Sequence, residues 1–563
     1  MSTHTGARVA AVLALCFFSF FVHLGTSEIT LMEARNFVAA REMAAGGSWL
    51  IPTLNGALRV AKPPLPTWPV AALLRLAGPT ASPALLRVPA ALMAALLVFF
   101  FWGLLHELTR GQPGEAEAPG RTAWLGALVL ASSLLVITVG REGHWDIFAH
   151  AWMLGALWAL ARGWHAAGRG LGWFALSGLL LGLSMLSKGP VAPYAMLLPF
   201  LVSFGVPRLN PARGPVRPHR AGLLLALGVG LGVGLAWPTY LALQRSVAPA
   251  ALAVARVEVS SWAGRHAEPF WEYWNFPVFA GIWAPVALLA LAAPFARPRA
   301  GRYVPYVAGL GWLLATLLLL SIIPEKKERY MLPLMPPLAL LIAGLLRHFE
   351  TALGQRNTTG LEARLLRWWA GLLVLAFALV PVALGLAWVP RFLPAGRFVV
   401  AAVAFGLLVG AAWWGGFRRK QPGALIASSL TGMSLLLALL LPAHAAWVNR
   451  SADPGLRHAA DLRHNPELAH RPWYTFEELN MKQLWEAGRA APAWPRTPDS
   501  ALVRPTQVVA VLSGADVASQ LPGAWRQQVR LRVVDSFYLD QERKGGYWRV
   551  TLVEPIRPAS AAK

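Results

Sequence analysis

Carboxylates are scarce in the first 448 residues of this sequence, so each one is a candidate for chemistry. This part of the chain holds 15 acids against 35 lysines and arginines, and Asp146 is its single aspartate. A carboxylate can take up the proton of a reacting hydroxyl group or orient that group. Glu28, Glu33 and Asp146 all lie between apolar runs, and we take them as the candidate catalytic acids.

Cations lie in the same stretches as these acids. Lys62 precedes two prolines that fix an extended backbone, and Tyr330 follows a basic run. Cations placed in this way stabilise negative charge that develops during a reaction. The candidates are Lys62, Arg265, Lys326, Lys327 and Arg329. The alternatives are attraction of the run 326–329 to anionic lipids, snorkelling of Lys62 to headgroups, and a helix N-cap role for Asp146.

The composition excludes a water-soluble globule. The chain has 563 residues, of which 56% are hydrophobic and 14% charged, and its mean hydropathy is +0.48. Soluble domains carry about 25% charged residues. The net charge of +24 goes with basic loops between apolar runs, which favours membrane lipids over nucleic acid as the partner. The lone Cys16 excludes an intrachain disulfide framework and a cysteine-based zinc cluster.

The apolar runs predict an all-α polytopic membrane protein of about 13 transmembrane helices. They lie near 9–25, 86–105, 122–140, 147–161, 171–186, 190–204, 221–243, 276–295, 303–323, 332–346, 368–389, 398–416 and 424–446. Short basic loops at 206–220, 297–302 and 417–421 indicate the cytoplasmic side. The loops 26–85, 141–146, 244–275 and 323–331 then face outward and hold ten of the fifteen acids. No acid falls at mid-span, which argues against a transporter.

Two domains are expected. Residues 1–448 form the membrane domain, and 449–563 have the composition of a soluble α/β domain on the outer side, with strands predicted at 506–512, 528–538 and 547–553. Within the first outward loop, 32–45 predicts an amphipathic helix that lies in the membrane interface.

Several motifs resemble those of a known enzyme family. They are Glu33-x-Arg35, Arg41-Glu42-Met43, Gly47-x-Trp49-Leu50-Ile51-Pro52, Asn55-Gly56, Lys62-Pro63-Pro64-Leu65, 140–146, Ser187-Lys188-Gly189-Pro190, 265–271 and 327–337. In this order they resemble the polyprenyl-phosphate-sugar-dependent membrane glycosyltransferases, the glycosyltransferase family 39 and aminoarabinose-transferase-like group, which is related to the protein O-mannosyltransferases.

The resemblance implies a GT-C fold in a bacterial inner membrane, with the active site and C-terminal domain in the periplasm. It implies inverting transfer of a sugar from a polyprenyl (undecaprenyl) phosphate donor to lipid A, another envelope glycan or lipid, or a protein. It adds Arg35, Asn55, Lys188 and Tyr330 to the sites for lipid phosphate and sugar. Acidic residues usual in the family are replaced here by Met32 and Ala61, which leaves the choice of base among Glu33, Glu28 and Asp146 open.

The sequence is also compatible with two other functions and with one cofactor. The chain could be a flippase of lipid-linked sugars, or a degenerate relative that only binds lipid, as the replacements at Met32 and Ala61 suggest. No cofactor is firmly expected. A divalent metal on His144 and His266 is a weaker alternative, because the two histidines are not closely spaced.

Overall fold

The protein is described by a computed structural model. It describes residues 3–556 apart from 167–169, 206–218, 265–266, 355–359, 386–393, 451–453, 496–501, 503–504, 526 and 539–545. The chain divides into two compact units. The membrane unit comprises Met1–Thr26, Ala61–Pro66 and Arg87–His444; the sheet unit comprises Ser27–Val60, Thr67–Leu86 and Ala445–Lys563.

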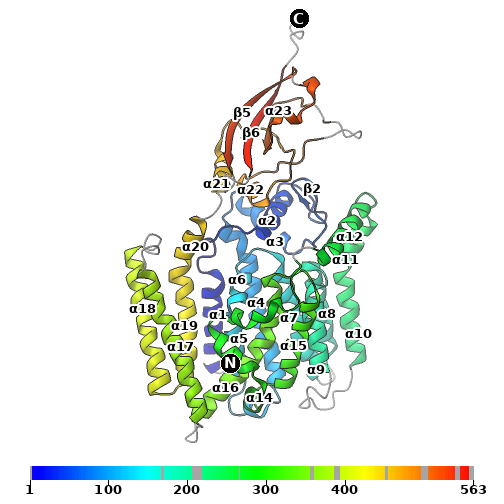
Figure 1. The fold of residues 1–563 in the computed structure, drawn as a ribbon. Coiled ribbons are helices and arrows are strands. Elements are labelled where there is room, and N and C mark those ends of the chain that lie inside the picture. The colour runs from blue at the N-terminus through cyan, green and yellow to red at the C-terminus, as the bar shows by residue number, and fades with distance from the viewer. Residues whose placement is uncertain are drawn as a thin grey trace. The chain divides into compact units, whose positions relative to one another are not determined.

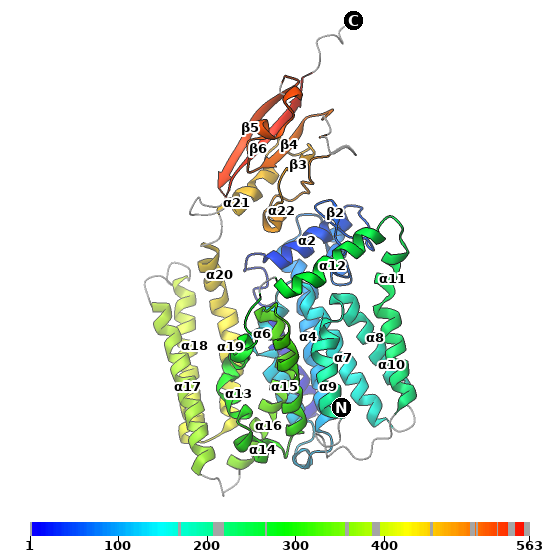
Figure 2. The same ribbon diagram turned by 45° about the vertical axis from the view of Figure 1, so that its right-hand side comes forward.

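Helices, most of them apolar, make up the membrane unit, and residues 83–86 and 445–450 at two helix ends belong to the sheet unit (Figures 1 and 2). In chain order they are α1 (Thr3–Cys16), η1 (Phe17–Phe21), α4 (Pro83–Thr109), η2 (Pro113–Glu115), α5 (Arg121–Ala131), α6 (Leu134–Gly140), α7 (Trp145–His165), α8 (Leu171–Lys188), η3 (Pro193–Leu197), α9 (Leu198–Gly205), α10 (Arg220–Gly234), α11 (Ala236–Leu243), α12 (Ala248–Gly264), η4 (Glu272–Trp283), α13 (Ala284–Leu291), α14 (Ala293–Ala300), α15 (Tyr306–Ile322), η5 (Glu328–Leu334), α16 (Met335–Gly354), α17 (Gly360–Gly385), α18 (Ala395–Trp413), η6 (Trp414–Arg418), α19 (Pro422–Leu435), η7 (Leu436–Leu440) and α20 (Leu441–Arg450).

The membrane character of this unit is confirmed. Among the described residues, seven helices are long and apolar enough to cross a bilayer, and nine if each of two bent pairs counts as one span. Helices α8 and α10 pack closely because glycines face each other: a Cβ on Gly178 would lie 2.5 Å from the carbonyl oxygen of Ala226. Small residues allow such close approach between membrane helices.

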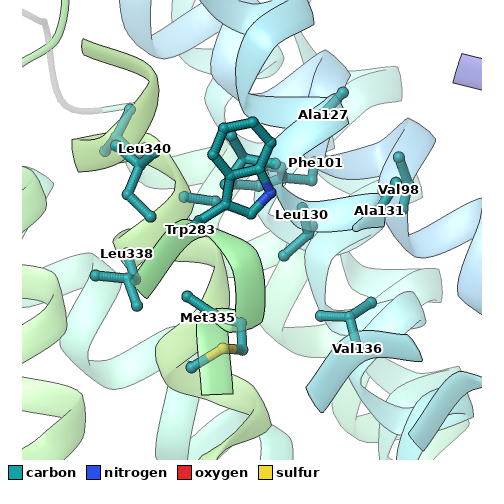
Figure 3. Close-up of a cluster of buried hydrophobic side chains, with 14 of the residues drawn as sticks. Val98, Phe101, Ala127, Leu130, Ala131, Val136, Trp283, Met335, Leu338 and Leu340 are labelled. Carbon is teal, nitrogen blue, oxygen red and sulfur yellow. The ribbon is translucent and has the colours of Figure 1, made fainter. Parts of the chain in front are cut away.

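The core of the membrane unit surrounds Trp283, which is fully buried (Figure 3). Its indole nitrogen donates a hydrogen bond of 2.8 Å to the hydroxyl of Ser132. The hydroxyls of Ser132 and Ser133 also bond the carbonyls of Leu128 and Val129 four residues back. Such bonds bend helices, and α5 and α6 meet here at 61°. α6 then leads the chain into the short turn 141–144 before Asp146.

The sheet unit contains a four-stranded sheet of order β3-β4-β6-β5. Its strands are β3 (Trp473–Tyr474), β4 (Val509–Ser513), β5 (Val529–Tyr538) and β6 (Tyr547–Pro555). β3 runs parallel to β4, and β6 runs antiparallel to β4 and β5. The short helices are α21 (Pro454–Asp461), η8 (Leu462–His464), α22 (Met481–Glu486), α23 (Val517–Gln520) and η9 (Gly523–Trp525). The three predicted strands are therefore present, and the structure also contains β3, which the sequence did not predict.

The first long loop belongs to the sheet unit rather than to the membrane helices. It forms α2 (Leu31–Ala44), a hairpin of β1 (Thr53–Leu54) and β2 (Ala57–Leu58), and α3 (Thr67–Ala77). A helix is therefore present at the predicted residues 32–45, and Thr30 caps it. The prediction that it is amphipathic is wrong, because residues around most of the helix are buried, among them Ala34, Phe37 and Arg41. The ring of Phe37 packs 5.5 Å from that of Trp485, so α2 and α22 share one core.

Candidate functional site

Asp146 opens α7 and is buried, with 1% of its surface exposed. The N-cap of α7 is His144, whose Nδ1 accepts a hydrogen bond of 3.3 Å from the amide of Asp146. The Asp146 carboxylate therefore does not have to cap the helix. It lies in the first helical turn, where the helix dipole favours a negative charge.

Two cations from other elements converge on this carboxylate. Lys188, in the last turn of α8, forms an ion pair with Asp146 and is itself 8% exposed. α8 ends there because Gly189 takes a positive φ of 73°, which favours glycine. The Nε atom of Arg329 in η5 lies 3.5 Å from Oδ2 of Asp146. Burial alone would oppose ionisation of Asp146, and the adjacent cations Lys188 and Arg329 compensate its negative charge.

The ring of Tyr330 lies among three cations. The charged groups of Lys188, Arg329 and Lys327 are 4.7, 5.3 and 5.8 Å from its centroid. Cations at such distances interact favourably with an aromatic face. The Tyr330 hydroxyl is 3.5 Å from Oε1 of Glu325, and the same oxygen accepts a hydrogen bond of 2.5 Å from the Lys327 ammonium.

These residues form a cluster with excess positive charge. We call Asp146, Lys188, Glu325, Lys327, Arg329 and Tyr330 the Asp146 cluster. It contains three cations against two carboxylates. Lys62 belongs to the same unit and adds a fourth positive charge that acts on Lys188. Such an arrangement favours binding of an anion, and phosphate in particular.

Lys326 has a different environment from Lys327. Its ammonium donates to the carbonyl oxygens of Ser321 and Ile323, at 3.0 and 2.6 Å, and lies 5.5 Å from the ring centroid of Tyr273. Burial lowers the pKa of Lys326, against the opposing charges of Glu272 and Glu268. Lys326 thus satisfies carbonyls at the end of α15, where a cation also interacts favourably with the helix dipole.

Tyr273 holds the backbone of the same segment. Its hydroxyl accepts a hydrogen bond of 3.1 Å from the amide of Lys327 and donates one of 3.4 Å to the carbonyl of Lys327. A short antiparallel bridge joins Ala267 to Glu325. The segment that carries Lys327, Arg329 and Tyr330 is therefore fixed by backbone contacts.

The histidines near Asp146 make contacts that do not require a metal. Nε2 of His144 lies 2.7 Å from Glu142, and Nδ1 of His150 lies 2.6 Å from the carbonyl oxygen of Asp146. No group of three or more His, Cys, Asp or Glu side chains arranged to hold a metal ion occurs in the part of the chain that the structure describes. His266, the other predicted ligand, lies outside the described residues, as does Arg265.

The other predicted site residues lie in the sheet unit. The carboxylate of Glu33 accepts a hydrogen bond of 2.9 Å from the Thr30 amide at the start of α2, and Glu28 lies 3.8 Å from Lys482. Arg35 contacts the sulfur of Met32 at 3.9 Å. Both amide atoms of Asn55 bond the backbone of Ala491, at 2.7 and 2.8 Å.

The structure thus brings together Asp146, Lys188, Lys327, Arg329 and Tyr330. The sequence reasoning missed Glu325 and Tyr273. Glu325 is one of the ten acids in the outward loops, and Tyr273 lies two residues after the motif 265–271 of the family resemblance. No spacing in the sequence, however, indicates that either contacts Lys327.

Comparisons with known proteins agree with this fold. Residues 61–230 match the sequence profile of the family described as dolichyl-phosphate-mannose-protein mannosyltransferase, and 257–393 match that of the Alg9-like mannosyltransferase family. ArnT from Cupriavidus metallidurans, solved with bound undecaprenyl phosphate, superposes with a TM-score of 0.68 over 98% of both chains at 18% identity. The chain has the GT-C glycosyltransferase fold. The apo structure of the same ArnT gives a TM-score of 0.66 over 99% of both chains, also at 18% identity.

Two sequence relatives point to the same enzyme class. The undecaprenyl phosphate-alpha-4-amino-4-deoxy-L-arabinose arabinosyl transferase 1 of Sodalis glossinidius is 29% identical over 440 residues, which cover 73% of this chain and 71% of the relative. The corresponding transferase of Edwardsiella ictaluri is 27% identical over 73% of this chain and 72% of its own. The resemblance to polyprenyl-phosphate-sugar-dependent GT-C enzymes is confirmed, and the chain is a membrane glycosyltransferase.

Proposed function

We propose that this GT-C protein transfers a sugar from a polyprenyl phosphate, such as undecaprenyl phosphate, to lipid A or to another envelope lipid or glycan. The observation that carries the proposal is the Asp146 cluster, in which cations outnumber carboxylates around Tyr330. The names of the relatives support the donor, since both include undecaprenyl phosphate.

The proposed reaction forms one bond and breaks another at the anomeric carbon. An oxygen of the acceptor bonds to this carbon from the face opposite the phosphate, which inverts its configuration. The bond between the carbon and the phosphate oxygen breaks, and the phosphate keeps the electron pair. A hydroxyl acceptor gives its proton to a carboxylate. Lys188, Lys327, Arg329 and the Tyr330 hydroxyl then stabilise the negative charge on the leaving phosphate.

Asp146 best fits the role of holding cations in this reaction. Its pairing with Lys188 and Arg329 makes it a weak proton acceptor, because nearby cations favour the ionised carboxylate. Glu33 and Glu28 remain the candidate bases from the sequence, with Asp146 as the third. The other proposed donor contacts are Lys62, Arg35, Asn55, Lys326 and Arg265, of which Arg265 lies outside the described residues.

We further propose thirteen membrane spans and a periplasmic site. To the seven long helices and the two bent pairs we add α1 with η1, α7, η3 with α9, and α15, which are apolar but shorter or less hydrophobic. The basic segments 297–302 and 418–420 then lie on the cytoplasmic side. This topology places the Asp146 cluster and the C-terminal region on the periplasmic side of a bacterial inner membrane.

A deletion strain tests the proposal. Its lipid A and envelope glycans are compared by mass spectrometry with those of strains complemented by wild type, Asp146→Asn or Glu33→Gln. We expect the deletion to lose a sugar-sized mass that wild type restores and Asp146→Asn does not. Glu117→Gln is the matched control, because Glu117 forms an exposed ion pair with Arg302. Restoration by every acid variant would contradict the site, and a sugar lost from proteins alone would identify a protein acceptor.

A further inference from the structure

Two groups of the Asp146 cluster share one carboxylate oxygen. The Lys327 ammonium lies 2.5 Å, and the Tyr330 hydroxyl 3.5 Å, from Oε1 of Glu325. Both groups are hydrogen-bond donors that the proposed function assigns to the lipid phosphate. A carboxylate oxygen and a phosphate oxygen offer these donors the same kind of charged acceptor.

The Glu325 side chain is not required to hold its segment in place. The backbone of Glu325 pairs with Ala267, and the Tyr273 hydroxyl bonds both the amide and the carbonyl of Lys327. Lys326 anchors the same segment to the carbonyls at the end of α15. The Glu325 carboxylate can therefore give up Lys327 and Tyr330 without loss of these contacts.

The other two cations of the Asp146 cluster pair with a different carboxylate. Lys188 and Arg329 are paired with Asp146, which is buried and has 1% of its surface exposed. Glu325 and a bound phosphate therefore compete for the hydrogen-bond donors of Lys327 and Tyr330. Because Glu325 is itself buried, with 9% exposed, its charge is weakly screened by water.

We propose that Glu325 is an anionic competitor that promotes release of the polyprenyl phosphate product. The inference rests on the proposed function. A sugar-linked donor is a phosphodiester with one negative charge. The product is a monoester that carries between one and two negative charges near neutral pH, since the second pKa of such a phosphate is about 6. Repulsion from Glu325 therefore acts more strongly on the product than on the donor.

The test is binding of undecaprenyl phosphate, and of uncharged undecaprenol, to the purified full chain in lipid nanodiscs. We expect Glu325→Gln to bind undecaprenyl phosphate about tenfold more tightly, as removal of one buried charge a few ångströms from the phosphate implies. Binding of undecaprenol should not change. Glu328→Gln is the control, because it removes the same charge from an exposed position in the same segment.

Kinetics give a second readout. In steady-state transfer, Glu325→Gln should show stronger inhibition by undecaprenyl phosphate and a lower kcat, with a smaller change in KM for the donor. Glu325→Ala should act in the same direction if the glutamine variant does not fold. Unchanged or weaker binding of undecaprenyl phosphate by the folded variants would overturn the role of Glu325. Equal binding of undecaprenyl phosphate and undecaprenol by wild type would instead overturn the proposed donor site.

Discussion

At the residue scale, the site depends on a buried carboxylate that keeps two cations in place. Asp146 contacts Lys188 from α8 and Arg329 from η5, so one side chain joins three separate elements. A buried charge is tolerated only when it is paired. The single aspartate of the first 448 residues therefore lies where two cations require a buried negative charge.

Variants at Asp146 and Lys188 should distinguish the role of this ion pair in sugar transfer from its role in stability. We expect Asp146→Asn to lower transfer by at least about a hundredfold, because the phosphate-binding cations lose their orientation. It should also lower the free energy of unfolding by about 3 kcal/mol, since Lys188 stays buried without a partner. The double variant Asp146→Asn/Lys188→Met should recover stability in thermal melts but no activity. Recovery of activity as well would show that the ion pair has no role in transfer.

At the element scale, the segment between α15 and α16 presents the cations. Lys326 ties its start to α15, Tyr273 of η4 holds its backbone, and η5 carries Arg329 and Tyr330. Lysines that are neighbours in sequence thus have different roles. Lys326 bonds carbonyls, whereas Lys327 contacts Glu325 beside Tyr330.

Tyr273 is a positioning residue for this segment. We expect Tyr273→Phe to lower kcat/KM about tenfold, because the Lys327 backbone loses both bonds to the hydroxyl. The fall should appear mainly in KM for the donor, and the free energy of unfolding should change by only about 1 kcal/mol. Tyr306→Phe is the matched control, since it removes a hydroxyl bond to the carbonyl of Ala290 at the other end of α15. Equal kinetic losses in both variants would contradict a specific role.

At the scale of the whole molecule, the chain folds as two units that are not consecutive in sequence. The first long loop and the C-terminal region share a core, with Phe37 against Trp485 and Asn55 bonded to Ala491. Arg41 is central to this unit. Its guanidinium donates to the carbonyls of Leu484 and Trp485, and burial, opposed in part by the nearby carboxylates, lowers its pKa to about 10.

Arg41→Met should therefore weaken the sheet unit as a whole. We expect a loss of about 2–4 kcal/mol in the free energy of unfolding, because the buried Leu484 carbonyl loses its donor and the Trp485 carbonyl keeps only Arg463. In limited proteolysis, cleavage within 27–60 and within the C-terminal region should increase together. Arg75→Met, at an exposed position of α3 in the same unit, should leave both unchanged. Increased cleavage in only one of the two regions would show that they fold independently.

The sequence predicts elements better than it predicts contacts. Long apolar runs are sufficient to place the membrane helices. Alternation is sufficient for β5 and β6, and a short apolar run for β4, because these patterns are local. The pairing of Glu325 with Lys327, or of Asn55 with Ala491, depends on how distant segments pack. Motifs predict Lys188 and Tyr330, and charge predicts Lys327 and Arg329. Only the fold shows that Lys188 and Arg329 pair with Asp146 and that all three cations lie around the ring of Tyr330.

Reconstituted transfer tests the central claim most directly. Purified wild-type protein in proteoliposomes receives a labelled undecaprenyl-phosphate-linked sugar together with lipid A. We predict a new labelled glycoside and release of one undecaprenyl phosphate for each sugar transferred, and neither with Asp146→Asn. Movement of the labelled donor across the vesicle membrane without a new glycoside would contradict the account and identify a flippase.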